Sequence, residues 1–317
     1  MRILFIGSAD IAIPSIRILL ENKIKVVGVI SQPDRPAGRK KILTSTPLKS
    51  YCVNCNIDVF TPEKIESDES YNFVKKINPS LIVVVAYGQF IPEKIINLAT
   101  HRAINLHPSL LPKYRGATPI QHSLLNGDSY TGVSIIDVSK KMDCGDILLQ
   151  KKINILDEDD YLSLYKKLSN IGAFLLKDAI TGILNNNILK ISQIESESTY
   201  VKKISKEDGN INWNDSAKKI SNKIRAFKEW PGSYCTLPNG KKLIIWKVSI
   251  EMRNGYPGEI LDDNLLIGTG KESIRLIEVQ IPSKKRISAE SFLNGNKLKV
   301  KSKTVSYTHL TLPTKLA

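Results

Sequence analysis

The stretch that decides the fold reads AINLHPSLLPKYRGAT and runs from Ala103 to Thr118. Its apolar start carries Asn105 and His107 two residues apart, and alternate residues of a β-strand project from the same face of a sheet. Pro108 disfavours continuation of that strand, because proline has no backbone N–H to donate. We therefore expect Asn105 and His107 to lie together at the carboxyl end of a strand, where open α/β sheets bind ligands.

Strand and helix patterns alternate upstream of this stretch. Residues 3–6 have the pattern of a buried strand, residues 11–21 that of an amphipathic helix and residues 24–30 that of a second strand. This order is typical of a parallel sheet with crossover helices. The turn after the first strand holds Gly7 but no G-x-G-x-x-G, so the dinucleotide-binding fingerprint is absent. We predict an α/β catalytic domain with a Rossmann-like, mostly parallel sheet over residues 1–190.

The C-terminal third has a different pattern. Residues 191–206 are polar and weakly periodic, which predicts a linker. Short alternating segments separated by turn signals such as Asn-Gly follow, and they predict a small antiparallel β-barrel of the OB type over residues 207–303. Residues 304–317 show no pattern that fits this domain, so we interpret them as a non-native tail and assign them no function.

The composition is that of a globular protein, with 42% hydrophobic and 24% charged residues. No apolar run approaches the ~20 residues of a membrane span, and the N-terminus lacks a secretory cleavage pattern, so we expect a cytoplasmic protein without a membrane partner. Four cysteines are too few for a disulfide framework. Cys52 and Cys55 form one C-x-x-C without a second pair, so we expect no metal site and interpret both as helix thiols. We also expect a monomer.

The net charge of +15 is concentrated near the C-terminus, since residues 201–317 hold 22 basic and 11 acidic side chains. Such asymmetry favours a polyanionic partner, nucleic acid before membrane, although a merely lysine-rich, solvated surface is the alternative explanation. A second basic feature is the Pro- and Gly-rich segment 31–46, which we expect to be a long functional loop. Four of its side chains are suited to gripping phosphates, namely Arg35, Arg39, Lys40 and Lys41.

The residues at the predicted strand ends suggest acyl-type chemistry. A carboxamide and an imidazole aimed at one point can stabilise an oxygen that becomes anionic as a carbonyl is attacked. Asp143, on a loop predicted at the same rim, is the best candidate to fix the imidazole and move protons. No G-x-S-x-G or Cys-His nucleophile pattern is present. The alternative is that His107 is a buried structural residue, Asn105 bonds loop backbone and Asp143 caps a turn.

Longer motifs add a resemblance to a known family. The segments NLHPSLLPKYRGATPI and TGVSIIDVSKKMDCGDIL resemble the formyltetrahydrofolate-dependent formyltransferases. The segments QPDRPAGRKK, DGNINW and IRAFKEWPG resemble the branch of that family that acts on methionyl-tRNA. The resemblance covers residues 1–303. It implies transfer of a formyl group from the co-substrate 10-formyltetrahydrofolate to the α-amino group of methionyl initiator tRNA, a step of bacterial translation initiation.

The resemblance also implies roles for individual residues. Asn105 and His107 would polarise the formyl oxygen, while Asp143 would pair with His107 and manage the amine proton. The basic segment 31–46 would enter the tRNA acceptor stem, and the basic barrel would hold the tRNA backbone. The implied folate contacts are Ser109, Leu110, Leu111 and Pro112, with Tyr87 and Gly88 nearby.

Two other functions fit part of the pattern. A formyltransferase acting on a small amine, such as an amino sugar nucleotide or a purine precursor, would share Asn105, His107 and Asp143. It would need neither the basic segment nor a charged second domain. A non-catalytic RNA-binding protein that has kept the fold is the alternative from a different class.

Overall fold

The computed structural model describes residues 1–38, 40–296 and 298–305. The chain divides into two compact units, which are described separately below. The first unit comprises Met1–Ile120, Tyr130–Ile155 and Ser163–Lys202. The second unit comprises Gln121–Ser129, Leu156–Leu162 and the chain from Lys203 onward.

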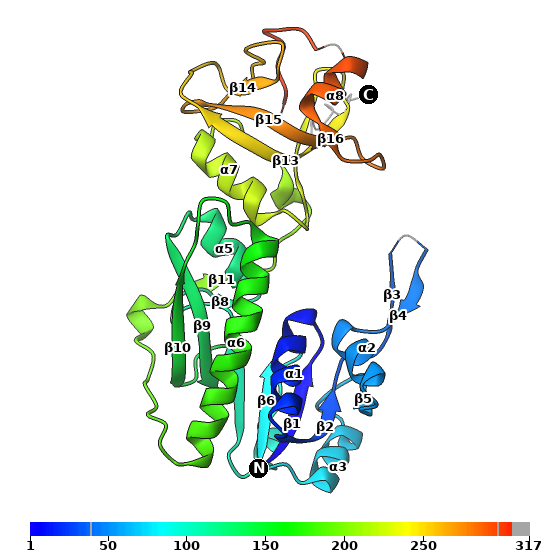
Figure 1. The fold of residues 1–317 in the computed structure, drawn as a ribbon, viewed down its shortest axis with the longest axis vertical. Helices are drawn as coiled ribbons and strands as arrows, with labels where there is room; N and C mark the ends of the chain where they lie inside the picture. The colour runs from blue at the N-terminus through cyan, green and yellow to red at the C-terminus, as the bar shows by residue number, and fades with distance from the viewer. Residues whose placement is uncertain (39, 297, 306–317) are drawn as a thin grey trace, which may run out of the picture. The chain divides into compact units, whose positions relative to one another are not determined.

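The first unit is built on a seven-stranded sheet with the strand order β10-β9-β7-β6-β1-β2-β5 (Figure 1). In the part of the sheet with the order β7-β6-β1-β2-β5, neighbouring strands are parallel. Strand β9 is antiparallel to both β7 and β10. The predicted Rossmann-like sheet is thus confirmed as a mixed, mostly parallel sheet. Its strands are β1 (Arg2–Gly7), β2 (Lys25–Ile30), β5 (Val59–Phe60), β6 (Leu81–Val85), β7 (Ala103–His107), β9 (Tyr130–Asp137) and β10 (Ile147–Asn154).

Helices cover both faces of this sheet. On one face, Gly172 of the longest helix lies so close to Leu106 of β7 that a Cβ at Gly172 would be 2.8 Å from it. On the other face, Ala103 and Val84 join a buried cluster that includes Val74 and Ile95 from two shorter helices. Asn105 lies on this second face, since it pairs in register with Val84. The helices of the first unit are η1 (Asp10–Ala12), α1 (Ile13–Glu21), α2 (Pro47–Asn54), α3 (Asp68–Ile77), α4 (Glu93–Ile96), α6 (Tyr161–Leu184) and η2 (Glu195–Glu197), whereas most of α5 (Pro119–Leu125) belongs to the second unit.

The basic segment 31–46 differs from the expectation of a loop. It contains an antiparallel hairpin of β3 (Arg35–Ala37) and β4 (Ile42–Thr44), with Arg35 paired to Thr44. Pairing between the two arms supplies backbone hydrogen bonds that the Pro- and Gly-rich composition did not suggest. All six residues of the two strands are exposed, so little apolar burial supports the hairpin.

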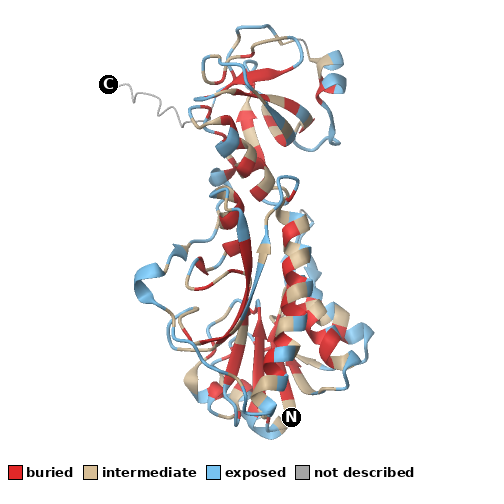
Figure 2. Cartoon of the chain, turned by 60° about the vertical axis from the view of Figure 1, so that its left-hand side comes forward, coloured by how far each residue is buried: buried red, intermediate tan, exposed pale blue. Residues whose placement is uncertain are grey.

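The second unit contains an antiparallel sheet with the order β12-β13-β15-β14, and β16 pairs with β15. Its core gathers Trp213 and the buried face of α7 against the sheet and Phe292 of α8. Figure 2 shows buried residues along the strands of each unit's sheet. The elements are η3 (Glu207–Gly209), α7 (Ala217–Ala226), β12 (Ser233–Thr236), β13 (Lys242–Glu251), β14 (Leu266–Gly268), β15 (Ser273–Gln280), β16 (Ile287–Ser288) and α8 (Ala289–Gly295).

Two residues of the predicted tail are integrated into the second unit. Thr304 is 3% exposed and donates from its hydroxyl to the carbonyl of Gly258 over 2.9 Å. Val305 exchanges backbone hydrogen bonds with Thr236 of β12. The rest of the predicted tail, residues 306–317, lies outside the described residues.

Candidate active site

Three polar side chains from two segments meet at the carboxyl end of β7. Asn105 and His107 project from that strand, and Asp143 lies on the loop that follows β9. The Nδ2 atom of Asn105 donates to Oδ1 of Asp143 over 3.4 Å. The Nδ1 atom of His107 lies 3.6 Å from Oδ2 of Asp143. The structure thus brings together the three residues that the sequence singled out for chemistry.

The second imidazole nitrogen of His107 determines its tautomer. Nε2 lies 2.9 Å from the carbonyl oxygen of Tyr114, and a carbonyl oxygen only accepts hydrogen bonds. Nε2 therefore carries a hydrogen, which leaves Nδ1 as the nitrogen that faces Asp143. A lone pair on Nδ1 and a carboxylate can bond only when a proton lies between them. His107 is 4% exposed, so its imidazole is largely shielded from water.

Glycines allow the backbone to hold Asp143 in place. Asp143 has φ +53°, and its Oδ2 accepts a hydrogen bond from the backbone N–H of Gly116 at 2.9 Å. Gly116 belongs to β8 (Arg115–Gly116), which pairs in parallel with β11 (Tyr200–Val201). Two residues after Asp143, a Cβ on Gly145 would be 1.8 Å from the carbonyl oxygen of Asp137. Only glycine fits there, so the loop can turn tightly against the end of β9.

The segment predicted to contact folate is anchored through one hydroxyl group. The Oγ atom of Ser134 on β9 donates to the carbonyl of Ser109 over 2.7 Å and accepts from the backbone N–H of Leu111 over 3.1 Å. Gln150 on β10 donates to the same Oγ and to the carbonyl of Leu111, both over 2.8 Å. Ser109 and Leu111 are buried, and Pro112 follows in a cis peptide bond. The hydrogen bonds of Ser134 and Gln150 therefore hold the backbone of this segment in place beside His107.

The other predicted folate neighbours lie just after β6. Tyr87 is 3% exposed, and burial raises the pKa of its hydroxyl to about 12. Its carbonyl accepts a hydrogen bond from Nε2 of Gln32 over 3.1 Å. Gly88 has φ +89°, a conformation that glycine adopts at little cost. Both residues extend the carboxyl edge of the sheet that carries Asn105.

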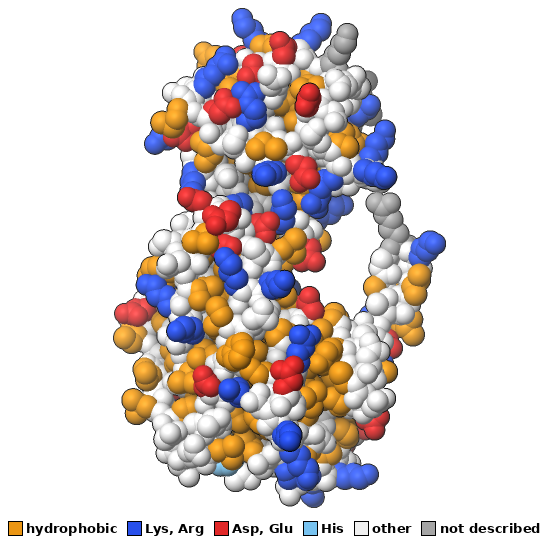
Figure 3. Space-filling model, in the orientation of Figure 1, with side chains coloured by type: hydrophobic (Ala, Val, Ile, Leu, Met, Phe, Trp, Pro, Cys, Tyr) orange, Lys and Arg blue, Asp and Glu red, His pale blue; other side chains and the backbone are white. Residues whose placement is uncertain are grey.

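The basic side chains of segment 31–46 lie on and around the β3–β4 hairpin. Arg35 pairs with Glu63, and both side chains are more than half exposed. Lys40 and Lys41 are exposed in the turn between the two strands, while Arg39 lies outside the described residues. Figure 3 shows basic and hydrophobic side chains together on this hairpin. Two apolar residues of this hairpin, Ile42 and Leu43, are 62% and 67% exposed to solvent.

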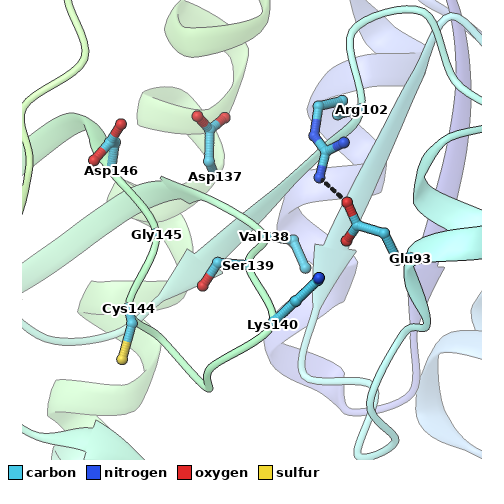
Figure 4. A pocket seen from close by; sticks show the side chains of 9 residues that line it. All are labelled: Glu93, Arg102, Asp137, Val138, Ser139, Lys140, Cys144, Gly145 and Asp146. Atoms are coloured by element: carbon cyan, nitrogen blue, oxygen red, sulfur yellow. Dashed lines mark hydrogen bonds and ion pairs between the residues drawn. The ribbon is translucent and has the colours of Figure 1, made fainter.

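An open hollow of about 410 Å³ lies beside the Asp143 loop. Figure 4 shows the ion pair of Glu93 and Arg102 on one side of it and Asp137 and Asp146 on the other. Asn105, His107 and Asp143 are not among the residues that line it. Within the described part of the chain, no group of three or more His, Cys, Asp or Glu side chains could hold a metal ion. No helix among those residues has both the length and the hydropathy needed to cross a membrane.

Several groups that position the site were missed from the sequence. The carbonyl of Tyr114 and the N–H of Gly116 are backbone groups, which no residue pattern identifies. Gln193 donates to backbone carbonyls of the Asp143 loop from within the predicted linker. Gly116 itself was a usable signal, because glycine is the usual residue where the backbone adopts a positive φ.

Comparison with known proteins gives a consistent result. A family model described as formyl transferase matches residues 1–180, and one described as formyl transferase, C-terminal domain, matches residues 203–297. A methionyl-tRNA formyltransferase of Sulfurihydrogenibium sp. (strain YO3AOP1) is 40% identical, over 94% of this chain and 98% of the relative. One from a Nitratiruptor species is 42% identical, over 95% of this chain and 98% of the relative.

Solved structures with similar folds are more distant in sequence. WlaRD, a sugar 3N-formyl transferase crystallised in the presence of dTDP and 5-N-formyl-THF, superposes with a TM-score of 0.67 at 23% identity, over 90% of this chain and 99% of that one. HypX from Aquifex aeolicus in complex with tetrahydrofolic acid gives a TM-score of 0.64 at 17% identity, over 95% of this chain and 50% of that one. At these identities the likeness concerns the fold alone.

Proposed function

Because this chain belongs to the methionyl-tRNA formyltransferase family, we propose that it transfers the formyl group of 10-formyltetrahydrofolate to the α-amino group of methionyl initiator tRNA. The family predicted from the motifs is confirmed by relatives that are about 40% identical over nearly the whole chain. The observation that carries the proposal is the convergence of Asn105, His107 and Asp143 around one point. That arrangement places a hydrogen-bond donor, a proton acceptor and a carboxylate around the position proposed for the formyl carbon.

The reaction needs one bond to form and one to break. The amine nitrogen of the methionyl group bonds to the formyl carbon, and the bond from that carbon to N10 of the folate breaks. The amine loses a proton and N10 gains one, so the site must stabilise an oxyanion and move a proton. The amide nitrogen of Asn105 carries two hydrogens, and Asp143 accepts only one of them. The second is available to the formyl oxygen.

His107 and Asp143 are suited to moving the proton. The Nε2 hydrogen of His107 is held by the carbonyl of Tyr114, so Nδ1 is the nitrogen that can accept the amine proton. Asp143 then stabilises the positive charge on the imidazole, as the carboxylates of catalytic triads do. Once it is protonated, Nδ1 can donate a hydrogen bond to the formyl oxygen and then pass the proton to N10 as the bond between N10 and the formyl carbon breaks. The folate is held along the rim by the segment from Ser109 to Pro112, with Tyr87 and Gly88 beside it.

The tRNA is bound by the basic parts of the chain. The β3–β4 hairpin carries Lys40 and Lys41 in an exposed turn, which suits contacts to the phosphates of an acceptor stem, and Arg35 at its base adds a further charge. Arg39 belongs to the same proposed set. The 22 basic side chains after residue 200 supply the charge for holding the tRNA backbone. The protein acts as a monomer in the cytoplasm, where initiator tRNA is charged and used.

The fold of the second unit is an OB-type barrel in this proposal. The support comes from residues that bridge the two ends of its sheet. Ile260 pairs with Ile267 of β14, and Glu259 pairs with Lys303. Val305, two residues later, pairs with Thr236 of β12 at the opposite end of the strand order. A closed barrel protects the amides of Ile260, Thr236 and Val305 from hydrogen exchange, whereas fast exchange at all three would contradict closure.

A formylation assay tests the function directly. The protein is incubated with 10-formyltetrahydrofolate and either methionyl initiator tRNA, methionyl elongator tRNA or an amino sugar nucleotide. We expect formylation of the initiator tRNA, much slower reaction of the elongator and none of the small amine. Formylation of the amino sugar nucleotide alone would overturn the proposal in favour of a small-amine formyltransferase.

A variant separates catalysis from RNA binding alone. His107→Ala is expected to abolish most formyl transfer while initiator tRNA still binds with the wild-type Kd. Full formyl transfer by His107→Ala would contradict the catalytic assignment. Tight tRNA binding without any formyl transfer by the wild-type protein would indicate a non-catalytic RNA-binding protein.

A further inference from the structure

We propose that Gln193, held in place by Arg115, is a positioning residue that keeps the loop of Asp143 in the conformation that formyl transfer requires. The inference rests on the proposed function, since it assigns Gln193 a role in that reaction. The two hydrogen bonds that the Gln193 side chain donates go to the backbone of the loop that presents the third residue of the site. Gln193 therefore acts through Asp143 and not on the reacting atoms themselves.

Both polar atoms of the Gln193 side-chain amide form hydrogen bonds. Its Nε2 donates to the carbonyl of Asp143 over 2.8 Å and to the carbonyl of Gly145 over 2.7 Å. Its Oε1 accepts a hydrogen bond from Nε of Arg115 over 3.0 Å. A guanidinium only donates and the two carbonyls only accept, so this set of partners fits one orientation of a primary amide. A carboxylate at the same place could still bond Arg115 but could not donate to the carbonyls.

Arg115 gives Gln193 a rigid support. Its side chain is 1% exposed, and its Nη1 donates to Glu195 over 2.8 Å and to the hydroxyl of Tyr200 over 2.8 Å. Burial disfavours the charge on Arg115, but the bonds to Glu195 and Tyr200 outweigh that effect and raise the pKa of the guanidinium. The backbone of Arg115 is also fixed, because its N–H donates to the carbonyl of Thr199 over 2.8 Å.

The Asp143 loop needs such support because it is exposed on its N-terminal side. Lys140 and Lys141 are exposed, and Met142 is 65% exposed. Asp143 itself adopts φ +53°, in the left-handed region that few non-glycine residues occupy, although Asp is enriched among those that do. Its carboxylate must lie within reach of both His107 and Asn105. The two carbonyls bound by Gln193 flank Cys144, so a single side chain fixes the turn immediately after the carboxylate.

Kinetics of two variants and a matched control test the role. Gln193→Ala removes all three bonds, and Gln193→Glu keeps the volume and the bond to Arg115 but removes the donors. We expect both to lower kcat by about 10- to 100-fold, the scale of loss when a reacting group is misplaced by about 1 Å. KM for folate and for tRNA and the melting temperature should change little. Ser192→Ala, which removes a neighbouring hydrogen bond to the Asp146 side chain, should keep the wild-type kcat.

A double variant shows whether Gln193 acts through Asp143. In an Asp143→Ala background, Gln193→Ala should cause no further loss of kcat. Losses that multiply independently would overturn the proposal, as would full activity of Gln193→Glu. If Asp143→Ala itself kept full activity, both the proposed catalytic assignment and the positioning role of Gln193 would be wrong. If Asp143→Ala were inactive and Gln193→Ala fully active, only the positioning role of Gln193 would be wrong.

Hydrogen exchange keeps the test decisive if a variant is poorly folded. Amides of residues 139–146 should exchange faster in Gln193→Glu than in the wild type, with the rest of the first unit unchanged. Ser192→Ala should leave the exchange of this loop as in the wild type. Unchanged exchange of the loop in Gln193→Glu would contradict the role that we assign to Gln193.

Discussion

The backbone N–H of Gly116 donates to Oδ2 of Asp143 over 2.9 Å, although the two residues are 27 positions apart in sequence. Gly116 makes this contact with φ +114°, in the region that favours glycine. A Cβ at this position would be 2.3 Å from the carbonyl oxygen of Val201 on the paired strand β11. The hydrogen bond to Asp143 and the β8–β11 pairing therefore both require a glycine at position 116.

Gly116→Ala should lower both activity and stability. The methyl group would force β8 away from β11 and move the N–H that holds Asp143, so formylation should fall by at least about tenfold. Gly240→Ala is the matched control, because Gly240 also has positive φ but has no atom within 4 Å of the added Cβ. It should cost only the conformational strain of about 1 to 2 kcal/mol and leave kcat unchanged. Equal activity of the two variants would contradict the role of Gly116.

Asn105→Ala should lower kcat far more than it raises KM. Loss of one donor to a developing oxyanion typically costs about 100- to 1,000-fold in kcat. Steady-state formylation of methionyl initiator tRNA measures both constants. Asn97→Ala removes a hydrogen bond to Arg102 on the surface and serves as a control that keeps wild-type kinetics. A rise of KM without a fall of kcat in Asn105→Ala would show that Asn105 binds substrate but does not act in the transition state.

Replacement of Lys40 and Lys41 together should weaken tRNA binding and leave folate binding unchanged. If both lysines contact phosphates, the slope of log K against log salt should become shallower by about 1 to 2. Binding of labelled initiator tRNA between low and physiological salt gives that slope. Lys75→Ala with Lys76→Ala, on the last turn of α3, is the charge-matched control and should keep the wild-type slope. Loss of folate binding in the hairpin variant would contradict the assignment of this segment to tRNA binding.

The second unit should lose stability in acid through Arg275. This side chain donates to both carboxylate oxygens of Glu251, at 2.5 and 3.0 Å, and to both of Asp262, at 3.0 and 2.9 Å. The bond to Arg275 lowers the pKa of Glu251. Burial raises the pKa of Asp262, but bonds to Arg275 and to two backbone amides outweigh it and lower that pKa as well. Stability from these bonds is present above the ordinary carboxyl pKa values and is lost as pH falls below about 4.

Urea unfolding followed by tryptophan fluorescence measures this effect, since all three tryptophans lie in the second unit. Arg275→Met should lower the urea midpoint at pH 7, and its difference from the wild type should shrink as the pH approaches 3. Lys285→Met, which removes an exposed positive charge from the same unit, should follow the wild-type pH dependence. A constant difference between Arg275→Met and wild type across this pH range would contradict the linkage.

Much of the first unit could be predicted because its elements are encoded locally. The apolar runs of β1 and β7 depend on neighbouring residues, and both strands are found where the pattern predicted them. The hairpin in segment 31–46 was missed for the opposite reason. Its strands are exposed and carry no apolar alternation, so only the pairing of 35–37 with 42–44 across the turn defines them.

The candidate site divides along the same line. The sequence by itself determined that Asn105 and His107 share a face at the end of a strand, because alternation along a β-strand is a property of the chain's own geometry. It also selected Asp143 as their partner, from chemistry and not from distance. Only the tertiary structure decided that Nδ1 of His107 faces that carboxylate and that Gly116 and Gln193 hold it there. Those contacts join residues 27 to 50 positions apart, and such spacing is set by the packing of whole segments, which no local pattern records.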